Sequence, residues 1–416
     1  MERCVEPSEV KGQIKAPSSK SMTQRAIAAA LLADGQSTIF NPSYCDDSLA
    51  AMSIALGLGA ILDPKPGELI IKGARILKEE KLNCGESGLA IRMFSPIAAL
   101  YPAEITMVGS NSLKKRPMGM IEEALNQLGV KCSTSGGFLP LTIEGPIRGG
   151  YCEIDGSVSS QLLTGLLMAL PLAEKDSEIK VSNLKSKPYI DMTIQLLRKF
   201  GISIECIGYE LFRIPGKQEY MPRKYTVESD WSGGAFLLVA GAINGSLNVQ
   251  GLHTDSKQSD MAVLSALEKA GAKMKIREDQ IDISKSELKA FEFDATESPD
   301  LFPPLVALAS FCTGISSISG VSRLIYKESD RATTLKEEFG KMNINIEITG
   351  DLMKITGGQP TGARVESHDD HRIAMAVAVA ALGASGKVNI RDSQCVAKSY
   401  PGFFDDIRYL GAIVRE

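Results

Sequence analysis

The sequence predicts a mixed α/β (α+β) protein of two similar domains, and three features of the chain support this class. Six segments open with polar or acidic residues and continue as apolar helices of small residues. A second helix follows each of them, and short β-branched runs bounded by Gly or Pro lie between the helices. The second helices start at intervals of roughly 70 residues, which indicates six internal repeats.

The two helices of each repeat have different surroundings in the prediction. The first helix is almost wholly apolar, so we expect it to be buried inside a layer of strands. These first helices are expected within residues 18–35, 85–102, 156–174, 228–245, 297–314 and 366–383. The second helix alternates polar and apolar faces, which is typical of a helix at a surface. The second helices are expected at residues 46–60, 118–130, 191–202, 260–272, 330–343 and 402–412.

Strands complete each repeat in the order strand, helix, strand, helix, strands. The most regular β-branched runs lie at residues 37–40, 103–109, 177–183, 245–251, 314–320 and 386–392. A repeat of this length is longer than the common solenoid repeats, so two compact domains are favoured over one extended array. Six repeats divide as three plus three near residues 224–230.

Composition restricts the kind of protein. A chain of 416 residues is long enough for two or three domains. Its 46 Lys and Arg against 50 Asp and Glu give no overall basic character, so an anion site must be built locally. The eight cysteines are scattered singly and the three histidines are far apart, which favours a reduced cytosolic protein without a metal centre. No secretory leader or membrane-spanning segment is indicated.

Basic residues lie where helix electrostatics disfavours them. Lys20 and Arg25 fall in the first two turns of a predicted helix, at the positive end of its dipole. Similar cations open other helices of the repeats: Arg92, Arg116, Lys187, Lys327, Arg331, Arg372 and Lys398. Each one alone is also explained as a solvated surface residue. Their recurrence predicts several phosphate or carboxylate groups bound in one place by side chains and free helix N–H groups.

Hydroxyl and acidic residues add to this pattern. Ser157, Ser159 and Ser160 suit either a helix cap or an oxyanion site. Asp230 is expected to be an N-cap. Asp300 and Glu328 are candidates for proton transfer, with a helix cap and a helix-start acid as the alternatives.

Six motifs together resemble one family over nearly the whole chain. They are "APSSKSMTQRA", "DGSVSSQLLTGLLMALPLA", "SKPYIDMT", "KESDR", "DDHRIAMA" and "CVAKSYPGFF". This chain therefore resembles the 5-enolpyruvylshikimate-3-phosphate synthase family. The resemblance implies βαβαββ repeats with buried helices, an inside-out α/β barrel in each of two domains. It places one domain at residues 19–228 and the other at 1–18 and 229–416, with the active site in the cleft between them.

The resemblance also implies an activity. The enolpyruvyl group of phosphoenolpyruvate is transferred to the 5-hydroxyl of shikimate 3-phosphate, and phosphate is released by addition and elimination. No metal, organic cofactor, nucleic acid or membrane is implied, and the protein is expected to be a cytoplasmic monomer.

Site residues follow from the resemblance position by position. The implied catalytic residues are Lys20, Asp300 and Glu328. The residues implied for shikimate 3-phosphate are Lys20, Ser21, Arg25, Ser159, Ser160, Gln161, Ser186, Tyr189, Asp300 and Lys327. The residues implied for phosphoenolpyruvate are Lys20, Gly88, Arg92, Arg116, Gln161, Arg331, His371, Arg372 and Lys398.

One motif departs from the family pattern. The chain has "ESGLAIRM", with Glu86, Leu89 and Met93 where the family commonly has an amide, a hydroxyl and a proline. Gly88 and Arg92 are kept. We predict reduced sensitivity to glyphosate, the family's competitive inhibitor, because Leu89 and Met93 alter the helix that lines its pocket.

Three other interpretations of the sequence are less favoured. A UDP-N-acetylglucosamine enolpyruvyl transferase would carry Lys-Asn at the first motif and a reactive Cys before Arg116, but the chain has Lys20-Ser21 and "GSNSLKKRP". A non-catalytic anion-binding protein would be signalled by loss of Lys20, Asp300 or Glu328, and all three are present. A domain of a larger pathway polypeptide is disfavoured, because the chain is expected to span the single enzyme.

Overall fold

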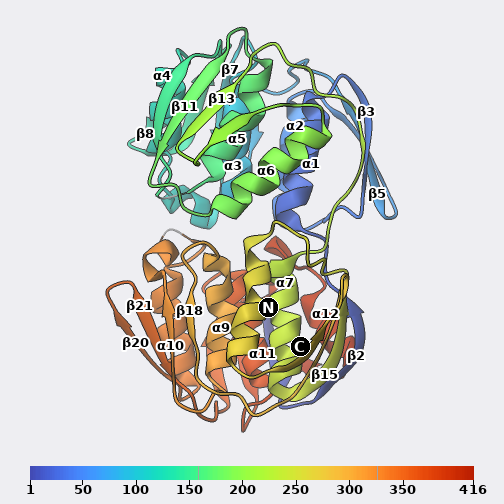
Figure 1. Cartoon of the computed structure of the whole chain (residues 1–416), viewed down its shortest axis with the longest axis vertical. Helices are drawn as coiled ribbons and strands as arrows, with labels where there is room; N and C mark the ends of the chain where they lie inside the picture. Colours follow the sequence, from blue (N-terminus) through green and yellow to red (C-terminus); the bar gives the residue numbers. More distant parts are fainter. Residues whose placement is uncertain (158, 326) are drawn as a thin grey trace. The chain divides into compact units, whose positions relative to one another are not determined.

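The computed structural model describes residues 1–157, 159–325 and 327–416, so residues 158 and 326, which fall within two of the site segments, lie outside the described part. The chain divides into two compact units, Ser18–Val227 and the combination of Met1–Pro17 with Glu228–Glu416. Both chain ends belong to the second of these (Figure 1). Across the described residues the strands form six four-stranded sheets, three in each unit. The predicted mixed α/β class is confirmed.

All six sheets have one strand order. The second repeat shows it: β6 (Lys81–Asn83) pairs in parallel with β7 (Glu104–Val108), which pairs antiparallel with β9 (Phe138–Glu144). The edge strand β8 (Lys131–Ser135) pairs antiparallel with β9. Parallel neighbours need a crossover connection, and the apolar helix of the repeat supplies it. This accounts for the strand, helix, strand, helix, strand, strand order of the sequence pattern.

The unit Ser18–Val227 holds three repeats. The first contains α1 (Lys20–Leu32), β3 (Gly35–Phe40), α2 (Asp46–Gly57), β4 (Ile61–Lys65), β5 (Glu68–Gly73) and β14 (Lys224–Thr226). The second adds α3 (Gly88–Ala98), the 3-10 turn η1 (Asn111–Lys115) and α4 (Gly119–Gln127) to its strands. The third contains β10 (Tyr151–Asp155), α5 (Gln161–Ala169), η2 (Leu170–Leu172), β11 (Ser177–Ser182), α6 (Lys187–Lys199), β12 (Glu205–Ile207) and β13 (Leu211–Ile214).

The other unit repeats the plan. Its first repeat contains β2 (Val10–Lys15), α7 (Trp231–Asn244), β15 (Gly245–Gln250), η3 (Ser259–Ala262), α8 (Val263–Lys269), β16 (Lys273–Ile276) and β17 (Gln280–Ser284). Its second contains β18 (Glu292–Asp294), η4 (Pro299–Leu301), α9 (Phe302–Ala309), β19 (Ile315–Ser319), η5 (Val321–Leu324), α10 (Arg331–Lys341), β20 (Asn345–Thr349) and β21 (Leu352–Thr356). Its third contains β22 (Ala363–Glu366), α11 (His371–Ala381), β23 (Val388–Arg391), η6 (Ser393–Lys398), α12 (Phe403–Tyr409), β24 (Ile413–Arg415) and β1 (Glu2–Glu6).

Segments distant in sequence complete the sheets of each unit. Strand β14 pairs with β3, in the register Lys224↔Thr38. Strand β2 pairs with β15, and β1 lies between β23 and β24. The unit Ser18–Val227 thus pairs its last strand with its first repeat, whereas the other unit takes strands from the start of the chain into its first and third repeats.

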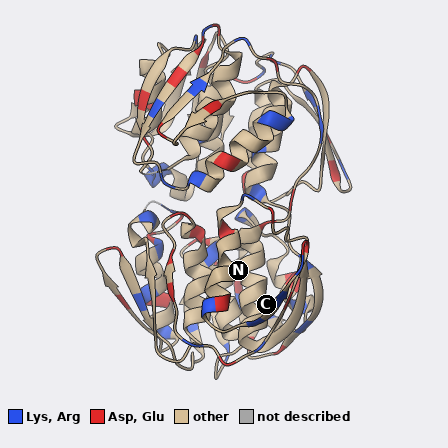
Figure 2. Ribbon diagram, in the orientation of Figure 1, with Lys and Arg blue, Asp and Glu red and all other residues tan. Residues whose placement is uncertain are grey.

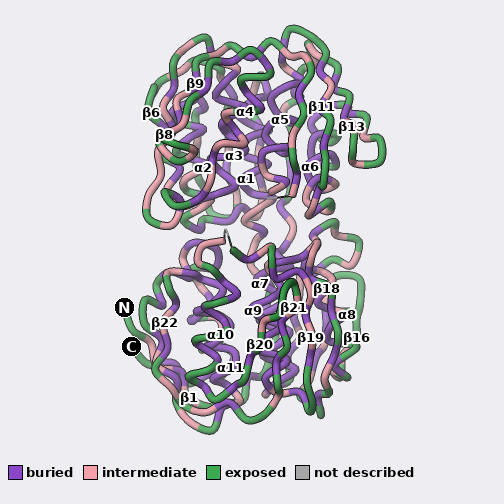
Figure 3. Tube along the Cα trace, turned by 90° about the vertical axis from the view of Figure 1, so that its left-hand side faces the viewer, coloured by how far each residue is buried: buried purple, intermediate pink, exposed green. Residues whose placement is uncertain are grey.

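The core of each unit consists of its crossover helices. Every residue of α3, α9 and α11 is buried, and α1, α5 and α7 are buried along nearly their whole length (Figure 3). Small residues permit this close approach. A Cβ added at Gly165 of α5 would lie 2.6 Å from the Met93 carbonyl oxygen of α3. The predicted burial of the first helices is thus confirmed.

Several local predictions can be compared with the structure. Asp230 is the N-cap of α7 and accepts from the Ser232 N–H at 3.2 Å, as predicted. Helix α6 begins at Lys187, so the expected start at residue 191 was wrong; Pro188 fits the first turn because N–H groups there have no partner within the helix. All eight cysteines are free thiols. Among the described residues, no helix combines the length and the apolar character needed to cross a bilayer.

Candidate active site

In the unit Ser18–Val227, the predicted site residues lie at helix N-termini. Lys20, Gly88, Gln161 and Lys187 are the first residues of α1, α3, α5 and α6. Along the six crossover helices, as far as they are described, Lys and Arg occur only in the first two turns and Asp and Glu do not occur (Figure 2). The free N–H groups and the cations therefore add their positive charge at the same places, which favours anion binding.

Four residues converge on the start of α3, and we call them the Gly88 cluster: Gly88, Arg92, Arg116 and Gln161. A Cβ on Gly88 would lie 2.6 Å from Arg116 Nη1, 3.2 Å from Arg92 Nη1 and 3.6 Å from Gln161 Oε1. Arg92 Nη1 donates to Gln161 Oε1 at 2.9 Å. Both arginines are almost completely buried. Two guanidinium groups against a glycine at a helix N-terminus are an arrangement that suits a compact anion.

Arg25 is a buried cation held by neutral groups. Its Nε donates to Thr193 Oγ1 at 2.9 Å, Nη1 to the Ser21 carbonyl at 3.0 Å and Nη2 to Thr164 Oγ1 at 3.4 Å. Burial lowers the pKa of Arg25 to about 10, while Tyr189 and Tyr225 oppose the change. Among the described residues none of its hydrogen-bond partners is a carboxylate. A buried charge without a counterion is costly, so this position suits an anionic ligand.

The other predicted residues of this unit lie at the same helix starts. Lys20 Nζ is 2.9 Å from Asp47 Oδ2 of α2, an ion pair across the first repeat. Ser159 Oγ accepts from the Gln161 N–H at 3.2 Å, whereas Ser160, the N-cap of α5, makes no side-chain cap bond. Ser186 is the N-cap of α6 in a left-handed conformation (φ 58°). These serines thus lie at or beside the N-caps of α5 and α6.

In the other unit, acids and bases meet around one carboxylate, and we call Asp300, Lys327, Arg331 and Arg372 the Asp300 cluster. Asp300 Oδ1 accepts from Lys327 Nζ at 3.0 Å and Arg331 Nη1 at 2.9 Å. Its Oδ2 accepts from Arg372 Nη2 at 3.1 Å. Asp300 lies in η4 with its carboxylate directed to these cations, so the helix-cap alternative was wrong.

The charged groups of the Asp300 cluster strongly influence one another's pKa values. Burial alone would raise the pKa of Asp300, but Arg372, Lys327 and Arg331 hold it well below its usual range. Burial lowers the pKa of Lys327, although Asp300 opposes this change. Without substrate Asp300 is therefore an ionised carboxylate and a weak base.

Glu328, His371 and Lys398 surround this cluster. Glu328 Oε2 accepts from Arg331 Nη2 at 2.5 Å, and Glu328 itself lies before α10, whose N-cap is Asp330. His371 and Arg372 begin α11, whose N-cap Asp370 also accepts from Arg331 Nε at 2.9 Å. Lys398 Nζ donates to the Asp369 carbonyl at 2.7 Å. Direct hydrogen bonds thus join five of the predicted residues, and Lys398 binds the residue before the N-cap of α11. The five are Asp300, Lys327, Glu328, Arg331 and Arg372.

Sequence reasoning missed several supporting residues. Thr164 and Thr193 hold Arg25, and Asp370 holds Arg331. Asp260 is buried and accepts from Ser232 Oγ, and burial with the nearby Asp300 raises the pKa of Asp260 to about 6. Their only sequence signal was a polar residue in an otherwise apolar helix, or an acid at a helix start.

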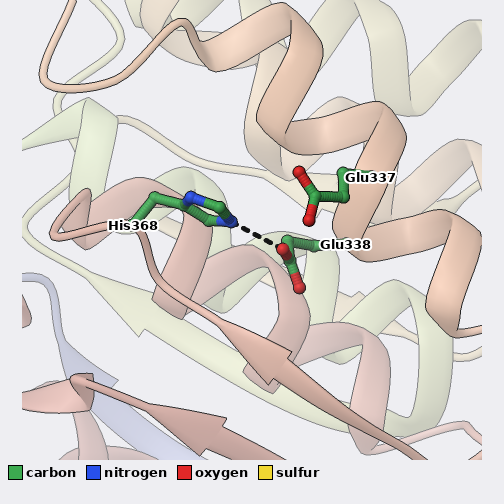
Figure 4. Close-up of side chains that lie close together, drawn as sticks. All are labelled: Glu337, Glu338 and His368. Carbon is green, nitrogen blue, oxygen red and sulfur yellow. Dashed lines mark hydrogen bonds and ion pairs between the residues drawn. The ribbon is translucent and has the colours of Figure 1, made fainter.

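One group of side chains has a donor set that could hold a metal ion, within the described part of the chain: Glu337, Glu338 and His368 (Figure 4). The ammonium group of Lys341 is 2.8 Å from Glu338 Oε1 and 3.3 Å from Glu337 Oε1. A cation of the protein itself therefore already offsets part of the negative charge of these carboxylates.

Comparison with known proteins adds independent information. A model of the family described as EPSP synthase (3-phosphoshikimate 1-carboxyvinyltransferase) matches residues 5–407. A 3-phosphoshikimate 1-carboxyvinyltransferase from Clostridium perfringens is 38% identical over 418 residues, with 99% of each chain covered. One from Thermococcus kodakarensis is 39% identical over 407 residues, covering 97% of this chain and 98% of the relative. The solved EPSP synthase from Acinetobacter baumannii is similar with a TM-score of 0.84 and 27% identity, with 100% of both chains covered.

Proposed function

Because the chain belongs to the EPSP synthase family, and is a 3-phosphoshikimate 1-carboxyvinyltransferase of the shikimate pathway, we propose that its helix-start clusters bind shikimate 3-phosphate and phosphoenolpyruvate. The observation that carries this proposal is the Gly88 cluster, where two buried arginines face a glycine at a helix N-terminus. Both substrates carry a phosphate and a carboxylate, which suits several separate anion sites.

The two substrates take different residues in this proposal. Phosphoenolpyruvate is held by the Gly88 cluster together with Lys20, Arg331, His371, Arg372 and Lys398. Shikimate 3-phosphate is held by Lys20, Ser21, Arg25, Ser159, Ser160, Gln161, Ser186, Tyr189, Asp300 and Lys327. Arg25 supports this assignment because a substrate carboxylate would give its buried charge a counterion. We assign the domains to residues 19–228 and to 1–18 with 229–416.

Asp300 takes the proton of the 5-hydroxyl as that oxygen bonds to C2 of phosphoenolpyruvate. Glu328, together with Lys20 or Lys398, supplies a proton to the methylene carbon in the same step. In the second step the C2–O bond to phosphate breaks, and the methyl carbon loses a proton to restore the double bond. Charge develops on groups that fixed cations already face, and such preorganised electrostatics lowers the barrier.

The cations around Asp300 link binding to catalysis. Arg331, Arg372 and Lys327 donate to Asp300 without substrate. Substrate anions compete for the same donors, so binding removes part of the charge that depresses the pKa of Asp300. The carboxylate then becomes a better base when the 5-hydroxyl is present.

We also infer that the protein is a monomer in the cytoplasm. The eight free cysteines support the location, because thiols stay reduced in that compartment.

Phosphate release by the purified protein tests the assignment. Rates are measured with both substrates, with each substrate alone, and with UDP-N-acetylglucosamine in place of shikimate 3-phosphate. We expect release only with phosphoenolpyruvate and shikimate 3-phosphate together, and loss of release in Lys20→Met. Unchanged activity of Lys20→Met, or release with the sugar nucleotide alone, would contradict the assigned roles.

A further inference from the structure

We propose that Glu338 is a positioning residue, which holds the turn at residues 366–370 and thereby fixes Arg372 and Lys398 for the anionic substrate. This inference rests on the proposed function, because it takes Arg331, Arg372 and Lys398 as the phosphoenolpyruvate residues. It assigns a role to two residues, Glu338 and His368, that the proposed mechanism does not use.

Glu338 connects α10 to the turn by two hydrogen bonds. Its side chain is fully buried, and Oε2 accepts from the Glu366 N–H at 2.9 Å. His368 Nε2 lies 2.6 Å from Glu338 Oε1, and Figure 4 shows the ring directed at this carboxylate. A buried carboxylate needs such partners, since an unpaired one is costly. The carboxylate thus binds one backbone and one side-chain group of the turn.

The same face of α10 also holds the far end of the turn. Glu338 follows Arg331 by seven residues, which places both on one side of the helix. Arg331 Nε donates to Asp370 Oδ2 at 2.9 Å and Nη2 to Asp370 Oδ1 at 3.2 Å. Helix α10 therefore forms hydrogen bonds with the turn on both sides of its centre.

The centre of the turn has a backbone conformation that requires such support. His368 and Asp369 have φ of 51° and 58°, in the left-handed region that is unfavourable for residues with a side chain. Lys398 donates to the carbonyl of Asp369, and Arg372 follows within α11. If the turn relaxes, the acceptor of Lys398 and the start of α11 both move.

If Glu338 had only a structural role, its important partner would be Lys341. The Lys341 ammonium is 2.8 Å from Oε1 and 2.9 Å from Oε2 of Glu338, an ion pair within α10. That pair would serve the helix alone. The bonds to Glu366 and His368 instead lead out of the helix to the segment that carries the site residues. The two roles therefore predict different kinetics.

Two variants and one control separate these roles. His368→Asn keeps a residue that tolerates a positive φ, but its side chain is too short to reach Glu338. Glu338→Gln keeps the size and one acceptor oxygen while removing the charge. Glu337→Gln is the matched control, because Glu337 is the exposed neighbour that shares Lys341 but makes no hydrogen bond or ion pair with the turn among the described residues.

Steady-state kinetics with each substrate varied in turn gives the readout. We expect the KM for phosphoenolpyruvate to rise about 10- to 100-fold in His368→Asn and Glu338→Gln, as displaced binding groups produce. The KM for shikimate 3-phosphate should stay within about twofold, and the double variant should cost less than the sum of the two. Glu337→Gln should behave as the wild type.

Three other results would contradict either the positioning role or the proposed function. An unchanged KM for phosphoenolpyruvate in His368→Asn, with wild-type turnover intact, would overturn the positioning role and leave the proposed function standing. Equal increases in both KM values together with a lower melting temperature would also overturn it, in favour of a stability role. Failure of the wild type to use phosphoenolpyruvate would instead contradict the proposed function.

Discussion

Arg331 Nη1 lies 2.9 Å from Asp300 Oδ1, although 31 residues separate the two in sequence. Lys327 and Arg372 bind the same carboxylate, so without substrate Asp300 is the anion of a cationic site. We predict that Asp300→Asn lowers kcat by about 10²- to 10⁴-fold, the usual contribution of a general base. The KM values should change much less, because the cations that hold the substrate anions remain.

The control for this variant is Asp279→Asn, at an exposed turn of the same unit. Phosphate release under saturating substrates measures kcat for both. If Asp300→Asn retained wild-type kcat, Asp300 would have no role as a base and would act only as a structural counterion.

Gly88 is predicted to be intolerant of a side chain. A Cβ there would lie 2.6 Å from Arg116 Nη1 and 3.2 Å from Arg92 Nη1, so the guanidinium groups must shift. We expect Gly88→Ala to raise the KM for phosphoenolpyruvate about tenfold or more, equal to about 1.4 kcal/mol of binding free energy. Gly119→Ala is the control, since a Cβ at this start of α4 meets nothing within 4 Å. Similar KM values for the two variants would show that the Gly88 cluster does not bind this substrate.

The repeats and the helix starts could be predicted from the sequence, because both are local. Helical periodicity and a cation near a helix start depend on neighbouring residues, as for Lys20 and Arg25. Contacts such as Arg25 with Thr193 could not be predicted, because these residues are 168 positions apart and lie on different helices. Tertiary packing decides which polar group in an apolar helix faces a charge.

The pairing of strands that are distant in sequence could not be predicted either. The pairing of β14 with β3, and of β1 with β23, joins strands from opposite ends of a unit. The start of α6 was misplaced because Pro188 reads as a helix breaker, whereas the first turn tolerates it. The alternating pattern identifies a strand but not its partner.

The departures in α3 lead to a prediction about glyphosate. Leu89 and Met93 are both buried in this helix, which packs against α5 at Gly165. We expect Leu89→Thr, alone and with Met93→Pro, to increase inhibition by glyphosate competing with phosphoenolpyruvate. The single variant is needed as a control, since a proline in a helix interior costs about 3 kcal/mol or more and could lower stability. Equal inhibition constants for wild type and both variants would contradict the prediction.

Arg25 is predicted to serve substrate binding at the expense of stability. Its buried guanidinium is bonded to neutral groups, and Thr164 and Thr193 can also bond each other at 3.2 Å. Arg25→Met should therefore leave thermal stability unchanged or raise it, because a buried charge is replaced by an apolar chain of similar length. The KM for shikimate 3-phosphate should rise about 10- to 150-fold, as loss of a charge-assisted pair costs about 1.5–3 kcal/mol.

Thermal unfolding and steady-state kinetics of the same preparation test both parts of this prediction. Arg198→Met, in the last turn of α6, controls for the loss of one positive charge from the unit. A large drop in melting temperature of Arg25→Met with an unchanged KM would mean that Arg25 is a structural residue.

Asp260 is predicted to make stability depend on pH. Burial and the neighbouring Asp300 raise the pKa of Asp260 to about 6, against the opposing effects of Arg372 and the Ser232 hydroxyl; Asp230 adds to the increase. An unfolded aspartate titrates near 3.8, so between about pH 4 and pH 6 the folded state binds more protons than the unfolded state. Stability from this group is therefore present at low pH and falls as the pH rises through about 6.

Asp260→Asn removes this titration but keeps an acceptor for Ser232. Its free energy of unfolding, relative to the wild type, should increase by roughly 1–3 kcal/mol between pH 4 and pH 7, since one pKa unit corresponds to about 1.4 kcal/mol. Urea unfolding at several pH values gives the comparison, with Asp405→Asn at an exposed ion pair as the charge control. A difference from the wild type that stays constant with pH would show that Asp260 has the same affinity for protons in the folded and unfolded chains. In that case burial and the neighbouring Asp300 would not raise the pKa of Asp260, and Asp260 would be ionised near Arg372 at pH 4 to 6.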